Sequence, residues 1–161
     1  MAVDMFLKID GIEGESQDSV HINEIDLLAW SWGMSQSGST HMGGGGGSGK
    51  VNVQDLSITK YIDSASHNLI QRSCDGRHIP EATLVVRKAG GDALEYVTIL
   101  MENVIVTSVS IGGSGGEDRL TENVTLNFAK FKVTYKPQEA DGSAGADKIA
   151  GWDIQGNEKN T

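Results

Sequence analysis

The stretch that decides the fold is LEYVTILMENVIVTSVSIGG, from Leu94 to Gly113, in which apolar and polar residues alternate. The apolar residues that share one parity are Val97, Ile99, Met101, Ile105, Val109 and Ile111. Because successive side chains of a strand point to opposite faces, this pattern predicts one long strand with a single buried face.

The next segment along the chain predicts a bent strand. After the turn GGSGGED comes LTENVTLNFAKFKVTYK, from Leu120 to Lys136. Val124, Leu126 and Phe128 share one parity, whereas Phe131, Val133 and Tyr135 share the other. A one-residue slip sends side chains to the opposite face, so the change predicts a β-bulge near Ala129–Lys130. A strand that bends there can close a small barrel.

Shorter extended segments surround these two. They are Met5–Gly11, Glu24–Gly33, Gln54–Ile62, Glu81–Ala89 and Ile149–Ile154, where Trp152 offers an anchor. Together they predict a mainly β, single-domain chain over residues 1–161. The expected architecture is an antiparallel β-barrel of two tightly packed sheets, with about seven or eight strands, one α-helix and a long extended loop.

The predicted helix lies in SASHNLIQRSCDG, which follows Asp63. Asp63 or Ser64 can cap its start, and Gly76 can end it. Its apolar residues fall close to one face, so we expect the helix to pack on the barrel through Ala65, Leu69, Ile70 and Cys74.

The composition excludes several classes of function. Of 161 residues, 22 are acidic and 13 basic, and a net charge of −9 argues against binding nucleic acid. Asp4 precedes any apolar run, so no cleaved signal peptide is predicted. No apolar stretch is long enough for a membrane helix. We expect a soluble protein without membrane insertion.

The glycine-rich loop contains a near-match to a phosphate-binding loop. In HMGGGGGSGKVNVQD, the run that starts at Gly44 fits G-x-x-x-x-G-K as far as Lys50. However, Val51 occupies the position of the magnesium ligand, and the following residues alternate as in a strand instead of starting a helix. We therefore expect a flexible loop, with no nucleotide and no other cofactor.

Catalytic and metal-binding patterns are missing as well. The histidines, His21, His41, His67 and His78, lack metal-ligand spacing. Cys74 has no thiol partner, and we expect it to be a small core residue of the helix. Ser73, Cys74 and His78 are neighbours, but nucleophilic catalysis also needs a base oriented by a third group. The sequence predicts no enzyme and no metal site.

Four ordered motifs resemble one known family. FLKIDGIEGES (6–16), IDLLAWSWG (25–33), LSITKYIDSASHNLIQRSCDG (56–76) and GWDIQGN (151–157) together resemble the haemolysin-coregulated protein (Hcp) family of bacterial type VI secretion. The resemblance implies a subunit of hexameric rings that stack head-to-tail into a tube inside a contractile sheath. It also implies a spike protein as partner and small effector proteins carried in the lumen. Such a protein is cytoplasmic before firing and is then secreted without a cleaved signal peptide.

The resemblance also assigns a contact loop. The extended loop of the family corresponds to part of Gly33–Asn52, so the ring-contact residues are expected at Gly33, Met34, His41, Met42 and Lys50. One alternative remains open, a monomeric β-barrel module that binds a carbohydrate or another small ligand. Such a module would show the mass of a single chain.

The motif LLAWSWG suggests where cargo would touch the tube. Alternation places Leu28, Trp30 and Trp32 on one side, and Leu27, Ala29 and Ser31 on the other. Each tryptophan can bury on the order of 200 Å², so that side should be core or subunit interface. The cargo contacts are then expected at Ala29 and Ser31. Two alternatives stay open: Ser31 is merely solvated, or it lies in the core together with Leu27 and Ile25.

Overall fold

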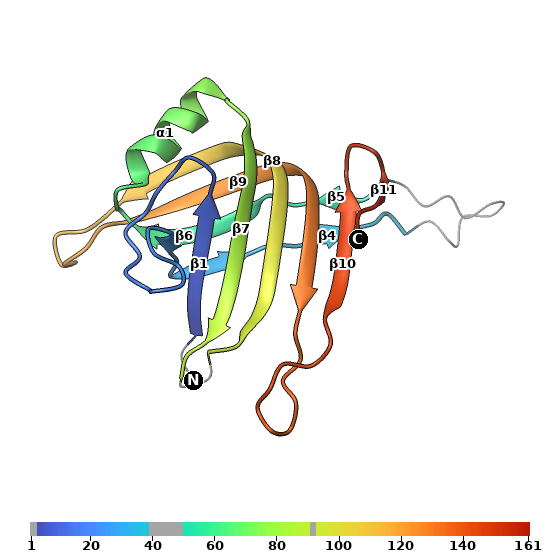
Figure 1. Cartoon of the computed structure of the whole chain (residues 1–161). Coiled ribbons are helices and arrows are strands. Elements are labelled where there is room, and N and C mark those ends of the chain that lie inside the picture. Colours follow the sequence, from blue (N-terminus) through green and yellow to red (C-terminus); the bar gives the residue numbers. More distant parts are fainter. Residues whose placement is uncertain (1–2, 39–49, 91–92) are drawn as a thin grey trace.

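A computed structural model describes residues 3–38, 50–90 and 93–161 (Figure 1). Its elements, in chain order, are β1 (Val3–Ile9), β2 (Ile25–Asp26), β3 (Ala29–Ser31), β4 (Met34–Ser35), β5 (Asn52–Val53), β6 (Leu56–Tyr61), α1 (Ser66–Asp75), β7 (Ile79–Lys88), β8 (Glu95–Gly112), β9 (Thr121–Tyr135), β10 (Lys148–Asp153) and β11 (Glu158–Lys159). All strand pairs are antiparallel. The predicted mainly β class is confirmed.

Two sheets share one long hairpin. The strands β8 and β9 pair with each other from Val97↔Tyr135 to Gly112↔Thr121. At one end of this hairpin the first sheet continues through β7, β1 and β2 on one side, and through β10 and β11 on the other. At the other end, β9 pairs instead with β6, which pairs with β3. The second sheet therefore has the order β3-β6-β9-β8.

The hairpin bends where it passes between the sheets. In β9 the buried side chains change parity between Phe128 and Phe131, as predicted. The pairs on either side of this point, Glu102↔Lys130 and Val104↔Phe128, keep one register. Both strands thus change phase together, with Asn103 at a left-handed φ of 55°. The predicted bulge at Ala129–Lys130 is a shared bend without a register shift.

The register shift lies further along, in β8 between Val106 and Ser108. The prediction of one buried parity for the whole of β8 is wrong, because Val104 and Val106 are buried with the opposite parity to Met101. Thr107 is the extra residue of β8 at this shift. Beyond it, the side chains with the parity of Met101 again face the inner side of the sheet, but at the end of the strand Ile111 is 51% exposed.

The segment Ile25–Ser31 joins the two sheets at the opposite corner. Leu27 N donates to Met5 O of β1 at 3.0 Å, and Leu28 N donates to Thr59 O of β6 at 2.8 Å. The chain changes its pairing partner between these two residues. The predicted pair of packed sheets is confirmed, although no unbroken ladder closes the described strands into a barrel.

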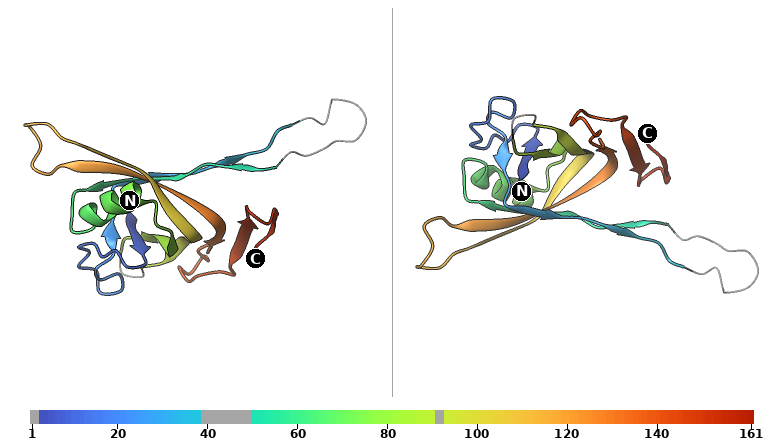
Figure 2. Two further views of the ribbon diagram at one scale, coloured as in Figure 1. Left: turned by 90° about the horizontal axis from the view of Figure 1, so that it is seen from above. Right: turned by 90° about the horizontal axis from the view of Figure 1, so that it is seen from below.

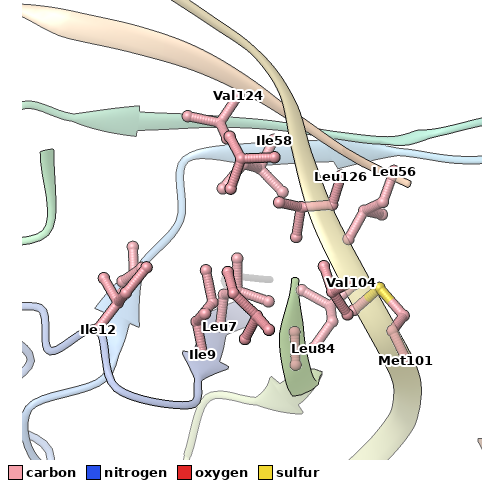
Figure 3. Packing of buried hydrophobic residues seen from close by; sticks show 14 of the residues in the cluster. Leu7, Ile9, Ile12, Leu56, Ile58, Leu84, Met101, Val104, Val124 and Leu126 are labelled. Carbon is pink, nitrogen blue, oxygen red and sulfur yellow. The ribbon is translucent and has the colours of Figure 1, made fainter. Parts of the chain in front are cut away.

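The core lies between the sheets and is built from alternate side chains of both (Figure 3). Leu7, Ile9 and Leu84 come from the first sheet. Leu56, Ile58, Val124 and Leu126 come from the second, and Met101 and Val104 come from β8. Trp152 packs against this core from β10, as predicted.

The helix α1 packs against β8, and it ends as predicted at Gly76, where φ is 64° and the N–H donates to Arg72 O at 3.0 Å. Its N-cap is Ala65, without a side-chain cap, although Asp63 Oδ1 accepts a hydrogen bond from Ala65 N at 2.9 Å. Only part of the predicted apolar face is buried. Ala65 and Leu69 contact the core, whereas Ile70 is 38% exposed.

Cys74 is exposed as well, so the prediction that it is a core residue is wrong. Cys74 lies in the last turn of α1, whereas the buried residues of the helix, Ser66 and Leu69, lie in its first half.

Candidate functional site

The outward face of the second sheet carries small, mostly uncharged side chains. Register places them in two rows across four strands, one of Ala29, Thr59, Asn123 and Ser110, and one of Ser31, Ser57, Thr125 and Ser108. Asp55, Thr107 and Asn127 adjoin the second row, and Tyr61 and Ile105 border the set. We call the eight residues of the two rows, together with Asp55, Thr107 and Asn127, the Ser/Thr face.

The hydroxyls of the Ser/Thr face bond to one another across the strands. Thr59 Oγ1 donates to Asn123 Oδ1 at 2.7 Å. Thr125 Oγ1 lies 2.6 Å from the hydroxyls of both Thr107 and Ser108. These lateral bonds hold four of the seven hydroxyl side chains of the face against the sheet.

Asp55 is the one charged residue of the Ser/Thr face. Thr107 Oγ1 donates to Asp55 Oδ2 at 2.7 Å, and Asn127 Nδ2 donates to Asp55 Oδ1 at 2.9 Å. Both donors are neutral, and within residues 3–38, 50–90 and 93–161 Asp55 forms no ion pair.

The residues predicted to contact cargo, Ala29 and Ser31, are exposed on this face. Trp30 and Trp32 lie on the opposite side of β3 and pack against the core. The Trp32 ring lies 4.8 Å from the Phe131 ring, and Trp32 Nε1 donates to Gln54 O at 2.9 Å. The alternative that Ser31 lies in the core is therefore wrong.

Ile25 and Leu27 are nevertheless buried, although they share the parity of Ser31. The reason is that the chain leaves the first sheet at Leu27 and enters the second at Leu28. The alternation of β3 cannot be extended backwards across that corner.

The predicted contact loop begins as a two-stranded ribbon. Its first residue, Gly33, accepts a hydrogen bond from Gln54 N at 2.9 Å, and Met34 pairs with Val53 and is 48% exposed. Lys50 is exposed too. This ribbon and the turn of the β8–β9 hairpin point in opposite directions from the body (Figure 2). His41 and Met42 lie outside the described residues.

The second sheet has two edges without a strand partner in the described chain. The strand β3 pairs only with β6, and β8 beyond Val104 pairs only with β9. An unpaired edge presents free N–H and C=O groups to another chain. The sheet that carries the Ser/Thr face can thus be extended on both sides.

His21 holds the loop that precedes β2 in place through hydrogen bonds to two glutamates. Its ring stacks on Phe6 at 4.4 Å, while Nε2 lies 2.6 Å from Glu95 Oε1 and Nδ1 lies 3.0 Å from Glu24. Burial lowers the pKa of His21, but the hydrogen bonds to Glu95 and Glu24 outweigh this and raise it. These contacts fix the loop that precedes β2 onto the outer side of the first sheet.

A second ion pair fixes the same loop. Arg87 Nη1 donates to Asp18 Oδ1 at 3.0 Å, and its guanidinium also contacts Asp4 at 3.1 Å. The hydrogen bond from Arg87 holds the pKa of Asp18 well below its usual range. These charged groups have structural partners.

Across the described ranges, no group of three or more His, Cys, Asp and Glu residues could hold a metal ion. No helix in this part of the chain is both long and apolar enough to cross a membrane.

Comparison with known proteins identifies the family. The family model described as "Type VI secretion system effector, Hcp" matches residues 6–135. The chain belongs to the Hcp family. This Hcp protein is 62% identical over 159 residues to Protein hcp1 of Pseudomonas aeruginosa, covering 98% of each chain.

Solved Hcp structures share its fold. Hcp1 from Salmonella typhimurium is 43% identical, with a TM-score of 0.84 over 99% of this chain and 100% of that one. A type VI secretion system effector from Yersinia pestis is 39% identical, with a TM-score of 0.77 over 93% and 99%. The resemblance seen in the sequence motifs is thereby confirmed.

Of the eleven residues of the Ser/Thr face, the sequence identified only Ala29 and Ser31; among the nine that it missed are Asp55, Thr107 and Thr125. The available signal is the alternation in DLSIT and ENVTLN, where small polar residues occupy the parity opposite to the buried one. That pattern indicates an exposed strand face, but it does not say which strands lie side by side.

Proposed function

We propose that this Hcp protein is the tube subunit of a type VI secretion system. Six copies close into a ring, and the rings stack head-to-tail into a tube inside the contractile sheath, beneath the spike protein. The subunit catalyses no reaction and needs no cofactor. It is made in the cytoplasm and leaves the cell with the tube.

The observation that carries this proposal is the second sheet, whose two edges, at β3 and at the end of β8, have no partner strand among the described residues. If the β3 edge of one copy lies beside the β8 edge of the next, the sheet continues from subunit to subunit. Such head-to-tail contacts close into a ring when the rotation between copies closes. The number six comes from the family resemblance.

In this arrangement the Ser/Thr face lines the lumen. Small side chains that bond to one another give a surface on which effectors of varied shape can rest, with Ala29 and Ser31 among the contacts. In the tube, the ribbon of β4 and β5, which leaves the body of the subunit (Figure 2), would extend towards the adjoining ring. The contact loop of which it is part contains Gly33, Met34, His41, Met42 and Lys50.

Native mass spectrometry at micromolar concentration tests the ring. The expected species has six times the chain mass of 17.1 kDa. A strictly monomeric species would contradict the proposal and favour the monomeric ligand-binding module.

Ser31→Gln tests the lumen assignment. Because Ser31 is exposed, we expect the ring mass and the melting temperature to stay unchanged. We expect the variant ring to retain less of an effector that the same secretion system delivers. If the position were buried, overpacking would cost about 1–3 kcal/mol. Ser114→Gln, in the exposed β8–β9 turn, is the control and should retain the effector. A Ser31→Gln ring that holds its effector as wild type does would exclude Ser31 from the cargo contact.

A further inference from the structure

Asp55 differs from every other residue of the Ser/Thr face because it brings a full negative charge to a surface of hydroxyl, amide and methyl groups. We propose that Asp55 makes the tube lumen selective for effectors with a lysine- or arginine-rich surface. This inference rests on the proposed ring, in which symmetry repeats Asp55 once in each subunit at the same level.

The hydrogen bonds of Asp55 hold the carboxylate in place without neutralising it. Each oxygen accepts one bond, from Thr107 Oγ1 at 2.7 Å and from Asn127 Nδ2 at 2.9 Å. A carboxylate has about four acceptor positions, so roughly two remain for a ligand. A carboxylate that is already fixed loses little entropy when it binds, and its bonds to ammonium or guanidinium groups are about twice as strong as neutral ones.

Other charges lie away from Asp55. Arg119 stacks over Tyr61, 3.8 Å from the ring centroid, at the far end of β6. Tyr61 lies six positions along the chain from Asp55, which in a strand is about 20 Å and about twice the Debye length at 0.1 M salt. Beyond the bend of β9, Lys130 lies opposite Glu102 and 3.9 Å from Asp153, so carboxylates offset that cation.

The rest of the Ser/Thr face adds little competing attraction. Four of its seven hydroxyls already take part in hydrogen bonds within the face, and the other three are neutral, so each attracts a cation less than a carboxylate does. A cationic group on an effector therefore finds its strongest acceptor at Asp55, whereas an anionic surface is repelled by the ring of carboxylates.

The test uses purified full-length protein and two fluorescently labelled peptides, octalysine and octaglutamate, with binding followed by anisotropy. Asp55→Asn removes the charge and keeps the size. Glu81→Gln, at an exposed position of β7 in the first sheet, removes the same charge elsewhere and serves as control. Native mass spectrometry of each variant reports whether rings form.

We expect wild-type rings to bind octalysine but not octaglutamate, with affinity falling as salt rises from 20 to 300 mM. Asp55→Asn should weaken octalysine binding at least tenfold, and Glu81→Gln less than twofold. If Asp55→Asn fails to form rings, Ser57→Lys takes its place. Its ammonium lies two residues along the same face of β6 and should abolish octalysine binding.

Three outcomes separate the two proposals. If rings form and Asp55→Asn or Ser57→Lys binds octalysine as tightly as wild type does, the proposed role of Asp55 is wrong. The proposal that the protein is a tube subunit is not affected by that result. Equal weakening by Glu81→Gln also overturns it, because the charge then acts only through the net charge of the protein. A wild-type protein without rings refutes the tube subunit itself, and with it this inference.

Discussion

Lys60→Met should strongly destabilise the protein, because it leaves a buried carboxylate without its cation. Lys60 and Glu122 have no exposed surface, and Lys60 Nζ donates to Glu122 Oε1. Nζ also donates to Asp63 Oδ1 at 2.8 Å and to Ser66 Oγ at 3.3 Å. Glu122 Oε2 has no hydrogen-bond partner in the described structure. After the change, Glu122 keeps only the hydroxyl of Ser66, at 2.8 Å.

The expected cost follows from this loss. Removing one partner of a buried ion pair costs about 3–5 kcal/mol. In a chain of this length, each kcal/mol lowers the melting temperature by about 2–4 °C, so Lys60→Met should melt roughly 6–20 °C below wild type. Replacing both partners, as in Lys60→Met with Glu122→Leu, should recover most of the loss, since apolar replacement of a whole buried pair is often neutral or stabilising.

The assay is urea unfolding followed by tryptophan fluorescence at pH 7, at one fixed protein concentration for all variants. Lys8→Met, at an exposed position of β1, is the matched control and should change the unfolding free energy by less than about 0.5 kcal/mol. The reasoning fails if Lys60→Met unfolds within about 1 kcal/mol of wild type, or if the double variant is less stable than Lys60→Met.

Three further predictions concern single residues. Gly151→Ala should cost about 1–3 kcal/mol, because an added Cβ would overlap the carbonyl oxygen of Asn160; an unchanged urea midpoint would contradict this. The raised pKa of His21 means that its stabilising contribution is complete below about pH 6.5 and is lost as the pH rises through the raised value. The difference in unfolding free energy between wild type and His21→Gln should therefore shrink from pH 6 to pH 9, and a constant difference would argue against the ion pairs. Cys74 is exposed and should react with a disulfide reagent in the folded protein almost as fast as after unfolding; protection of the folded monomer would count against the structure at α1.

The long strands show both what the sequence could predict and what it could not. In β9 the bend was visible, because large apolar residues occur on both sides of Ala129–Lys130. In β8 two phase changes, at Asn103 and Thr107, cancel each other. The two ends of the strand therefore share a parity, and the sequence pattern alone predicts one continuous buried face.

The candidate site, too, could be predicted only in part. The alternation in AWS was enough to separate Ser31 from the tryptophans that pack on the core. The neighbours of Ser31 depend on the register of β6 and β9, such as Ser57↔Thr125, and these positions lie far apart in the chain. One sequence contains no information on that register. The exposure of Cys74 was missed because spacing along a helix does not show where the helix leaves the core.

The strands that belong to both sheets also decide how the protein carries load. β8 and β9 run through both layers, and Ile25–Ser31 crosses at the opposite corner. A force that pulls the second sheet away from the first is therefore borne by covalent backbone at both places, and not by side-chain contacts alone. The layers cannot move apart without straightening the shared hairpin at its bend, in addition to breaking the side-chain contacts between them. Under tension the two layers should therefore open by unbending the hairpin, while the backbone at Ile25–Ser31 keeps them joined at the opposite corner.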